Sequence, residues 1–181
     1  MTDFPLHPTL YLDYDGVCHP AGLPVSLTGK LPHGPDLFVH APILVQLLAS
    51  YPAIEIVLTT RWSWLVGCKR AASYLPPELS SRVVGSVHRH KFGRGVILQP
   101  QVDAILRHVR LTGRRRWLVI DDDPEVLRAS QLAPGHFVVC DPQLGVSDFS
   151  VQENIRRRLA EMYAGVPSME LLLGENTQYQ P

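Results

Sequence analysis

Short apolar runs alternate along the chain with stretches in which apolar residues recur every three or four positions. The runs are nearly continuous in Leu, Ile, Val and aromatic residues, which predicts strands buried on both faces. They lie at 9–13, 54–58, 83–84, 117–120 and 137–140. The periodic stretches predict helices at 41–48, 63–74, 100–109, 124–130 and 151–163. This alternation predicts an α/β fold, a doubly wound and mainly parallel sheet with helices on both faces.

A single domain over residues 1–166 accounts for all of these elements, since a chain of 181 residues leaves little room for a second core. Residues 17–40 are rich in proline, glycine and histidine, and we expect an irregular loop or a small flap there. The segment 167–181 is expected to be a flexible C-terminal tail.

The composition of the chain excludes some classes of function. Seventeen basic and seventeen acidic side chains cancel, which excludes a general attraction to nucleic acid or membranes but not a local charged patch. Three widely spaced cysteines argue against a disulfide framework and against a cysteine zinc site. The N-terminus lacks the features of a signal peptide and no apolar run is long enough to cross a bilayer. We therefore expect a cytoplasmic protein without a membrane partner.

Three of the predicted strands end in polar residues, at Asp13, Thr59 and Asp121. In an open parallel sheet the site lies outside the carboxyl ends of the strands. We therefore expect these three strand ends to converge on one crevice.

Acidic residues dominate two of those ends. Asp13 and Asp15, two positions apart on a turn that Gly16 allows to fold sharply, can face one centre, although an ordinary acidic turn has the same pattern. The second cluster, 121–123, costs electrostatic free energy unless a cation binds there, and Mg²⁺ suits a few carboxylates with water and phosphate. Asp123 alone is explained as the cap of a helix that starts at Pro124.

These stretches resemble the haloacid dehalogenase (HAD) superfamily. Residues 10–17, LYLDYDGV, resemble its first motif, Leu58-Thr59 its second, and residues 119–122, VIDD, its fourth. Residues 57–62 and 141–146 further resemble a bacterial subgroup related to the HAD domains of multi-domain RNA repair proteins. The resemblance implies an HAD-like Rossmannoid core.

The resemblance also implies a phosphatase that forms an aspartyl-phosphate. Asp13 would attack phosphorus, and Asp15 would protonate the leaving oxygen and then activate water. Two acids at these positions imply a phosphatase rather than a dehalogenase. Mg²⁺ would be held by Asp13, the backbone carbonyl of Asp15, and Asp122 or Asp121, with Asp122 favoured as the direct ligand.

Two further catalytic positions follow from the family pattern. Thr59 would donate its hydroxyl to a phosphate oxygen, with Thr60 as the alternative if the strand runs one residue longer. The third motif requires a lysine that pairs with the nucleophile and the phosphate. Lys91 lies where the family places it, between the second and fourth motifs, and Lys30 and Lys69 are the alternatives.

Several neighbouring side chains are candidates for substrate binding. Arg61 and Trp62 could hold phosphate or stack on a base, and His90 belongs to a basic cluster, 88–94, on a loop that should border the site. The alternatives are that Trp62 packs in the core and that the histidines are solvated. The arginine tracts at 114–116 and 156–158 are expected to be solvated patches away from the chemistry.

The intervals between the motifs must also supply ordinary helices and a strand, so no large cap domain fits. An open site suits a phosphorylated macromolecule such as a nucleic-acid end. Two alternatives remain: a phosphatase of small metabolites, and a non-catalytic HAD-like module that binds metal or phosphate. The main support for the non-catalytic module is the third-motif lysine, because Lys91 is followed by a loop in the sequence pattern instead of beginning a helix at once.

Overall fold

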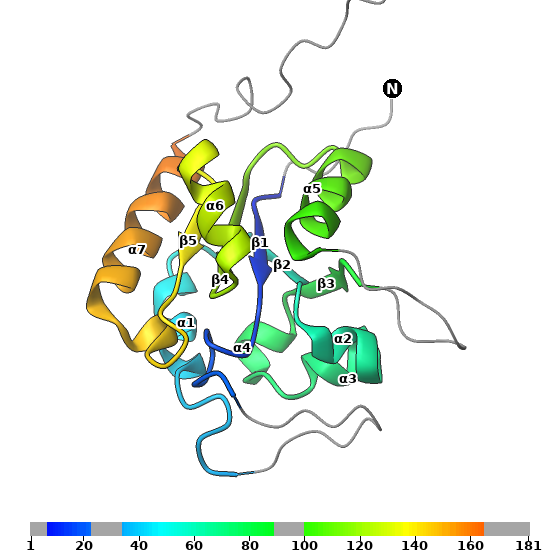
Figure 1. Cartoon of the computed structure of the whole chain (residues 1–181), viewed down its shortest axis with the longest axis vertical. Coiled ribbons are helices and arrows are strands. Elements are labelled where there is room, and N and C mark those ends of the chain that lie inside the picture. Colours follow the sequence, from blue (N-terminus) through cyan, green and yellow to red (C-terminus); the bar gives the residue numbers. More distant parts are fainter. Residues whose placement is uncertain (1–6, 23–33, 89–99, 165–181) are drawn as a thin grey trace, which may run out of the picture.

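Five parallel strands form one open sheet in the order β3-β2-β1-β4-β5, with helices on both faces (Figure 1). The computed structural model describes residues 7–22, 34–88 and 100–164. The strands are β1 (Thr9–Leu12), β2 (Glu55–Leu58), β3 (Val83–Ser86), β4 (Trp117–Asp121) and β5 (Phe137–Val139). The helices are α1 (Ala41–Leu48), α2 (Arg61–Val66), α3 (Cys68–Ala72), α4 (Pro77–Ser80), α5 (Gln101–Thr112), α6 (Pro124–Leu132) and α7 (Phe149–Tyr163), with a short 3-10 helix η1 (Gly145–Ser147).

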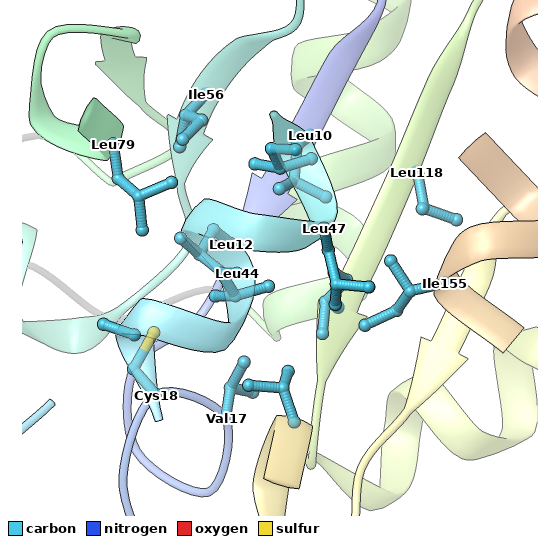
Figure 2. Close-up of a cluster of buried hydrophobic side chains, with 14 of the residues drawn as sticks. Leu10, Leu12, Val17, Cys18, Leu44, Leu47, Ile56, Leu79, Leu118 and Ile155 are labelled. Atoms are coloured by element: carbon cyan, nitrogen blue, oxygen red, sulfur yellow. The ribbon is translucent and has the colours of Figure 1, made fainter. Parts of the chain in front are cut away.

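The two faces of the sheet carry separate hydrophobic clusters. Leu10 and Leu12 of β1 point to a cluster shared with α1, α4 and α7, in which Leu44, Leu79 and Ile155 are buried (Figure 2). Tyr11, between them, belongs to the opposite cluster, which includes the buried faces of α5 and α6. Because successive side chains of a strand point to opposite faces, one buried strand serves both clusters. The predicted doubly wound α/β fold is confirmed.

The ends of the helices follow local chemistry. Asp123 Oδ1 accepts a hydrogen bond from the backbone N–H of Glu125 at 2.6 Å, which caps α6 as predicted. Asp148 caps α7 in the same way through the backbone N–H of Ser150. Gly113 ends α5 in the left-handed conformation that glycine adopts easily.

One predicted helix is in fact two. The segment 63–74 was expected to be continuous, but α2 begins at Arg61 and is interrupted after Val66. Gly67 takes φ +86° there, a value that breaks the helix, and α3 starts at the next residue. The short helix α4 and η1 were not expected, since neither is long enough to show a period.

The irregular segment 17–40 is described at 17–22 and 34–40, while 23–33 lies outside the described residues. Val17 and Cys18 are fully buried, so the first part of this segment packs into the core and is not a flap over the site. The predicted tail, 167–181, also lies outside the described residues. The described residues contain no separately folded cap, and none of their helices is both long and apolar enough to span a bilayer.

Candidate active site

The carboxyl ends of three neighbouring strands bring the predicted site residues to one edge of the sheet. Leu12 of β1 is in register with Leu58 of β2 and with Ile120 of β4. The residues that follow them, Asp13, Thr59 and Asp121, therefore lie side by side. Backbone hydrogen bonds from Asp13 N to Ile120 O (3.2 Å) and from Thr59 N to Leu12 O (2.9 Å) continue the pairing into the site. The predicted convergence is confirmed.

Three carboxylates form a compact cluster at this edge. One oxygen from each of Asp13, Asp121 and Asp122 lies within 4.8 Å of the other two. Burial raises the pKa of Asp13 well above its ordinary value, and the nearby charges of Asp121 and Asp15 raise it further. Burial is also the main cause that raises the pKa of Asp121 to about 7 and that of Asp122 to about 6. Close carboxylates whose charged forms are disfavoured in this way fit a hard divalent cation.

Asp121 and Asp122 have different surroundings. Asp121 is fully buried; its Oδ2 accepts a hydrogen bond from Gln101 Nε2 at 2.5 Å, and its Oδ1 accepts one from the backbone N–H of Asp123 at 3.0 Å. Both of its oxygens are thus engaged within the protein. Asp122 is half-buried and reaches towards the turn at Gly16. This difference favours Asp122 as the direct metal ligand and Asp121 as the residue that supports the cluster from beneath.

Gly16 permits this approach for two reasons. It has φ +70°, in the left-handed region that favours glycine. In addition, a Cβ atom at this position would lie 2.0 Å from Asp122 Oδ2, closer than atoms can approach. The turn after β1 and the carboxylate after β4 can therefore meet only if this residue has no side chain.

Asp15 is held at both of its carboxylate oxygens. Oδ2 accepts a hydrogen bond from Trp62 Nε1 at 3.0 Å, and Oδ1 is hydrogen-bonded to His19 Nε2 at 3.1 Å. Trp62 is fully buried among aromatic side chains, so it offers no ring face on which a base could stack. The expectation that Trp62 binds substrate directly is therefore corrected: the indole lies in the core, and its polar edge reaches the site through Asp15.

The two threonines that follow β2 differ in the hydrogen bonds that their hydroxyl groups make. Thr60 Oγ1 accepts a hydrogen bond from the backbone N–H of Trp62 at 3.2 Å and caps α2. Thr59 is also fully buried, but its Oγ1 has no hydrogen-bond partner among the described residues. A buried hydroxyl without a partner is costly, and this one lies at the strand edge beside Asp13. The geometry thus favours Thr59 over Thr60 as the donor to a phosphate oxygen.

The basic candidates are only partly described. Arg61 is exposed in the first turn of α2, next to Thr59 and Thr60. Lys91 and His90 lie outside the described residues, as does the alternative Lys30. Lys69 is exposed on α3. In the basic cluster 88–94 only His88 is described; it is buried rather than solvated, and burial lowers its pKa.

Sequence reasoning missed three supports of the site. His19 and Gln101 contact Asp15 and Asp121, but a lone polar residue in a loop or at a helix start gives no signal of what it contacts. The third is the 141–146 segment, which packs beneath the turn after β1. There Val146 N donates to Val17 O at 3.1 Å, and a Cβ at Gly145 would lie 2.4 Å from that same carbonyl oxygen.

The arginine tracts lie away from this edge. Arg114 is mostly buried at the opposite edge of the sheet, where Nη1 donates to Glu55 Oε2 at 2.6 Å and to Thr9 Oγ1 at 2.5 Å. The expectation of a solvated patch is therefore wrong for Arg114. On α7, Arg156 and Arg158 pair with acidic residues of the same helix. Arg156 is exposed, as expected, but the Arg158 side chain keeps only 17% of its surface exposed, so the expectation of a solvated patch is wrong for Arg158 as well.

Comparison with known proteins gives one match. A family model described as "HAD domain in Swiss Army Knife RNA repair proteins" matches residues 9–151. No curated protein and no solved structure matches the chain. The matched range covers β1 to the first three residues of α7, and so includes every strand of the sheet and the carboxylate cluster.

Proposed function

Since the chain belongs to the family of HAD domains found in Swiss Army Knife RNA repair proteins, we propose that it is a Mg²⁺-dependent phosphohydrolase that works through an aspartyl-phosphate on Asp13. The family supports a phosphohydrolase of the HAD type. The observation that carries the finer proposal is the joint placement of Asp13, Asp121 and Asp122, with ligand oxygens within 4.8 Å of one another.

Asp13 and Asp15 divide the reaction into two displacements. In the first, a carboxylate oxygen of Asp13 attacks phosphorus, and the bond from phosphorus to the leaving oxygen breaks as that oxygen takes a proton from Asp15. In the second, water gives a proton back to Asp15 and attacks the phosphorus of the aspartyl-phosphate. Phosphate leaves and Asp13 is regenerated.

The donor set fits Mg²⁺, which prefers oxygen ligands and few protein carboxylates. Asp13, Asp122 and the backbone carbonyl of Asp15 would hold the ion, and Asp121 would keep Asp122 and Asp13 in place. When bound, Mg²⁺ supplies positive charge that offsets the negative charges of the phosphate and the nucleophile. Burial and nearby carboxylates raise the pKa values of these three side chains, which means that their charged forms are disfavoured and that a bound cation would offset this cost.

Phosphate recognition is assigned to residues around this cluster. The buried Thr59 hydroxyl without a partner would donate to a phosphate oxygen. Arg61, exposed two residues after Thr59 at the start of α2, would contact the phosphate or its neighbour on the substrate. Lys91 and His90, which lie outside the described residues, remain the proposed basic residues between β3 and α5 in the sequence. Lys91 would pair with both Asp13 and the phosphate.

The proposed substrate is a phosphorylated macromolecule, such as a nucleic-acid end. Support comes from the absence of a folded cap among residues 7–22, 34–88 and 100–164, and from the exposure of Arg61 beside the site. A phosphate at the end of a long chain can reach such an edge while the rest of the substrate stays outside.

The test of the activity is hydrolysis of an aryl phosphate with Mg²⁺ and with EDTA, for the natural protein and for Asp13→Asn. We expect metal-dependent hydrolysis that Asp13→Asn abolishes. Asp103→Asn, which removes an equivalent charge from the exposed face of α5, is the matched control and should keep full activity. Metal binding without any turnover would contradict the proposal and favour a non-catalytic binding module.

The substrate class needs a separate experiment. Oligonucleotides with a 3′- or 5′-phosphate would be compared with small phosphorylated metabolites at low and high salt. A nucleic-acid substrate should bind more weakly as salt rises, and Arg61→Gln should reduce that dependence, whereas Arg115→Gln at the far edge of the sheet should not. Salt-independent turnover of metabolites alone would contradict the nucleic-acid assignment.

A further inference from the structure

The carboxylate of Asp15 is fixed by two rings that reach it from different segments. Trp62, in the first turn of α2, donates from Nε1 to Oδ2, and His19, four residues beyond Asp15, holds Oδ1. A carboxyl group bound at both oxygens cannot rotate about its own axis. The Asp15 side chain nevertheless keeps 28% of its surface exposed, so the held group still faces the open edge of the sheet.

The ring that makes the first contact is itself rigidly mounted. The Trp62 indole is fully buried, with ring centroids of Tyr74, Phe38 and Tyr14 at 5.2, 5.5 and 5.7 Å in edge-to-face arrangements. Phe38 also contacts the His19 ring, with centroids 5.0 Å apart. One aromatic cluster, made of these five side chains, therefore supports both groups that hold Asp15.

The backbone of Phe38 gives an independent sign of how firmly the cluster is built. Phe38 has φ +56°, the left-handed region that a bulky side chain rarely adopts, and it is the one such non-glycine residue among those described. Such a conformation costs on the order of 1 kcal/mol and persists only where surrounding packing requires it. The Phe38 ring packs in the cluster around Trp62, and its backbone carbonyl accepts a hydrogen bond from the N–H of Ala41 at 2.9 Å.

From this geometry we propose that Trp62 is a positioning residue for general acid catalysis: its indole N–H fixes the Asp15 carboxyl in the orientation from which the leaving oxygen receives its proton. The inference rests on the proposed phosphohydrolase function and adds to it a residue that never touches the substrate. An indole N–H can only donate, so this hydrogen bond holds Oδ2 throughout the cycle.

The dependence of kcat/KM on the leaving group distinguishes this positioning role of Trp62 from a purely structural one. An alkyl alcohol leaves phosphorus only if it receives a proton, whereas p-nitrophenolate leaves without one. Since kcat/KM reports the steps up to formation of the aspartyl-phosphate, the ratio of kcat/KM for an alkyl phosphate to that for p-nitrophenyl phosphate measures the proton transfer from Asp15.

The experiment compares this ratio in the natural protein, Asp15→Ala, Trp62→Phe and Phe137→Leu. Trp62→Phe removes the N–H and some ring volume, while Phe137→Leu removes ring volume from the hydrophobic cluster on the opposite face of the sheet and leaves the rings around Asp15 in place. We expect the ratio to fall by about a hundredfold or more in Asp15→Ala and by about tenfold in Trp62→Phe. Phe137→Leu should stay within about twofold of the natural ratio. Thermal melts show whether each variant is folded at the assay temperature.

A second measurement is the effect of Trp62→Phe added to Asp15→Ala, with the alkyl phosphate as substrate. If Trp62 acts through Asp15, the addition should leave kcat/KM unchanged within about twofold, because the residue it positions is already gone. Equal losses on both substrates in Trp62→Phe, or full additivity with Asp15→Ala, would overturn the inference while leaving the phosphohydrolase intact. Failure of the natural protein on both substrates would remove both proposals together.

Discussion

Single residues decide whether the turn after β1 and the end of β4 can approach each other. The carboxylate cluster requires glycine at position 16, because Asp122 occupies the space where a Cβ atom would lie. A metal site assembled from two loops depends on this kind of close backbone approach. The first prediction concerns that position.

Gly16→Ala is expected to weaken Mg²⁺ binding by about tenfold or more, because the new methyl group must displace Asp122. The measurement is calorimetric titration of Mg²⁺ into the metal-free protein. Gly22→Ala is a matched control: Gly22 also has a positive φ, +95°, but a Cβ there meets nothing within 4 Å. Equal loss of affinity in both variants would show that backbone strain alone, and not the contact with Asp122, is responsible.

At this scale the sequence predicts positions better than contacts. Asp13, Thr59 and Asp121 could be placed together because neighbouring parallel strands end at the same edge, a property of the sheet that needs no side-chain detail. The direction of the Trp62 indole could not be predicted, because a tryptophan after a strand end packs inward or outward depending on what surrounds it. Thr59 and Thr60 were distinguished only when the hydroxyl of one was seen to cap α2.

Helices and strands set the orientation of these residues through their ends. The segment after β4 is the clearest case, since Asp121 ends the strand, Asp122 reaches the turn at Gly16, and Asp123 caps α6. The three successive aspartates thus have different roles, and Asp123 caps a helix instead of joining the carboxylate cluster.

Asp123→Ala is expected to lower the free energy of unfolding by about 1 kcal/mol, the usual cost of losing a helix cap. For a chain of this length the melting temperature should fall by about 2–4 °C. Asp123→Asn removes the same charge but keeps a capping oxygen, so the difference between the two variants isolates the cap. Equal melting temperatures for Asp123→Asn and Asp123→Ala would contradict the capping role of Asp123.

Helix limits were the least predictable part of the fold, and the reasons are local. The helix expected over 63–74 starts at Arg61 because Thr60 caps it, and Gly67 divides it because its φ is incompatible with a helix. A threonine or a glycine occurs in helices, strands and loops alike, so the sequence alone does not show that Thr60 caps a helix or that Gly67 interrupts one. Residues 100–109 gave a correct helix because its apolar period is long and regular.

On the scale of the whole molecule, the sheet separates the proposed active site at one edge from a partly buried ion pair at the other. The carboxylate cluster lies at the carboxyl ends of β1 and β4, while Arg114 contacts Glu55 and Thr9 at the opposite ends of the strands. Perturbation of one edge should therefore leave the other intact.

Arg114→Leu is expected to destabilise the protein by about 1–3 kcal/mol, because it removes charge-assisted hydrogen bonds that join the starts of β1 and β2. Activity below the melting temperature should be unchanged. Chemical denaturation measures the first effect and aryl phosphate hydrolysis the second. Arg115→Leu, at the exposed neighbouring position, is the control, with an expected effect within about 0.5 kcal/mol.

The acid cluster also predicts how pH affects the metal-free protein. The pKa values of Asp121 and Asp122 are raised to about 7 and about 6, above those of the unfolded chain, so folding takes up protons between about pH 4 and 7. The electrostatic penalty is fully present above pH 7 and is relieved as pH falls through these values. Burial lowers the pKa values of His40, His88 and His108, which acts in the opposite direction as the pH falls. In EDTA, a change from pH 7.5 to pH 5.5 should therefore raise the melting temperature of the natural protein relative to that of Asp121→Asn, which keeps the three histidines.

Two controls assign that effect to the cluster. The melting temperature at pH 5.5 minus that at pH 7.5 should be smaller in Asp121→Asn than in the natural protein. Saturating Mg²⁺ should raise the melting temperature at pH 7.5 because it binds only the folded protein. An Asp121→Asn variant with the same pH dependence as the natural protein would contradict this explanation.

The order in which the strands lie has a consequence for how the protein is made. The strand that gives the backbone N–H of Asp13 a partner, β4, is synthesised more than a hundred residues after Asp13. Because the sheet places this late strand beside β1, nascent chains that end before β4 carry the proposed nucleophile without Asp121 and Asp122. Prematurely terminated products should therefore lack the proposed activity, which requires that the strands on both sides of this contact have been made.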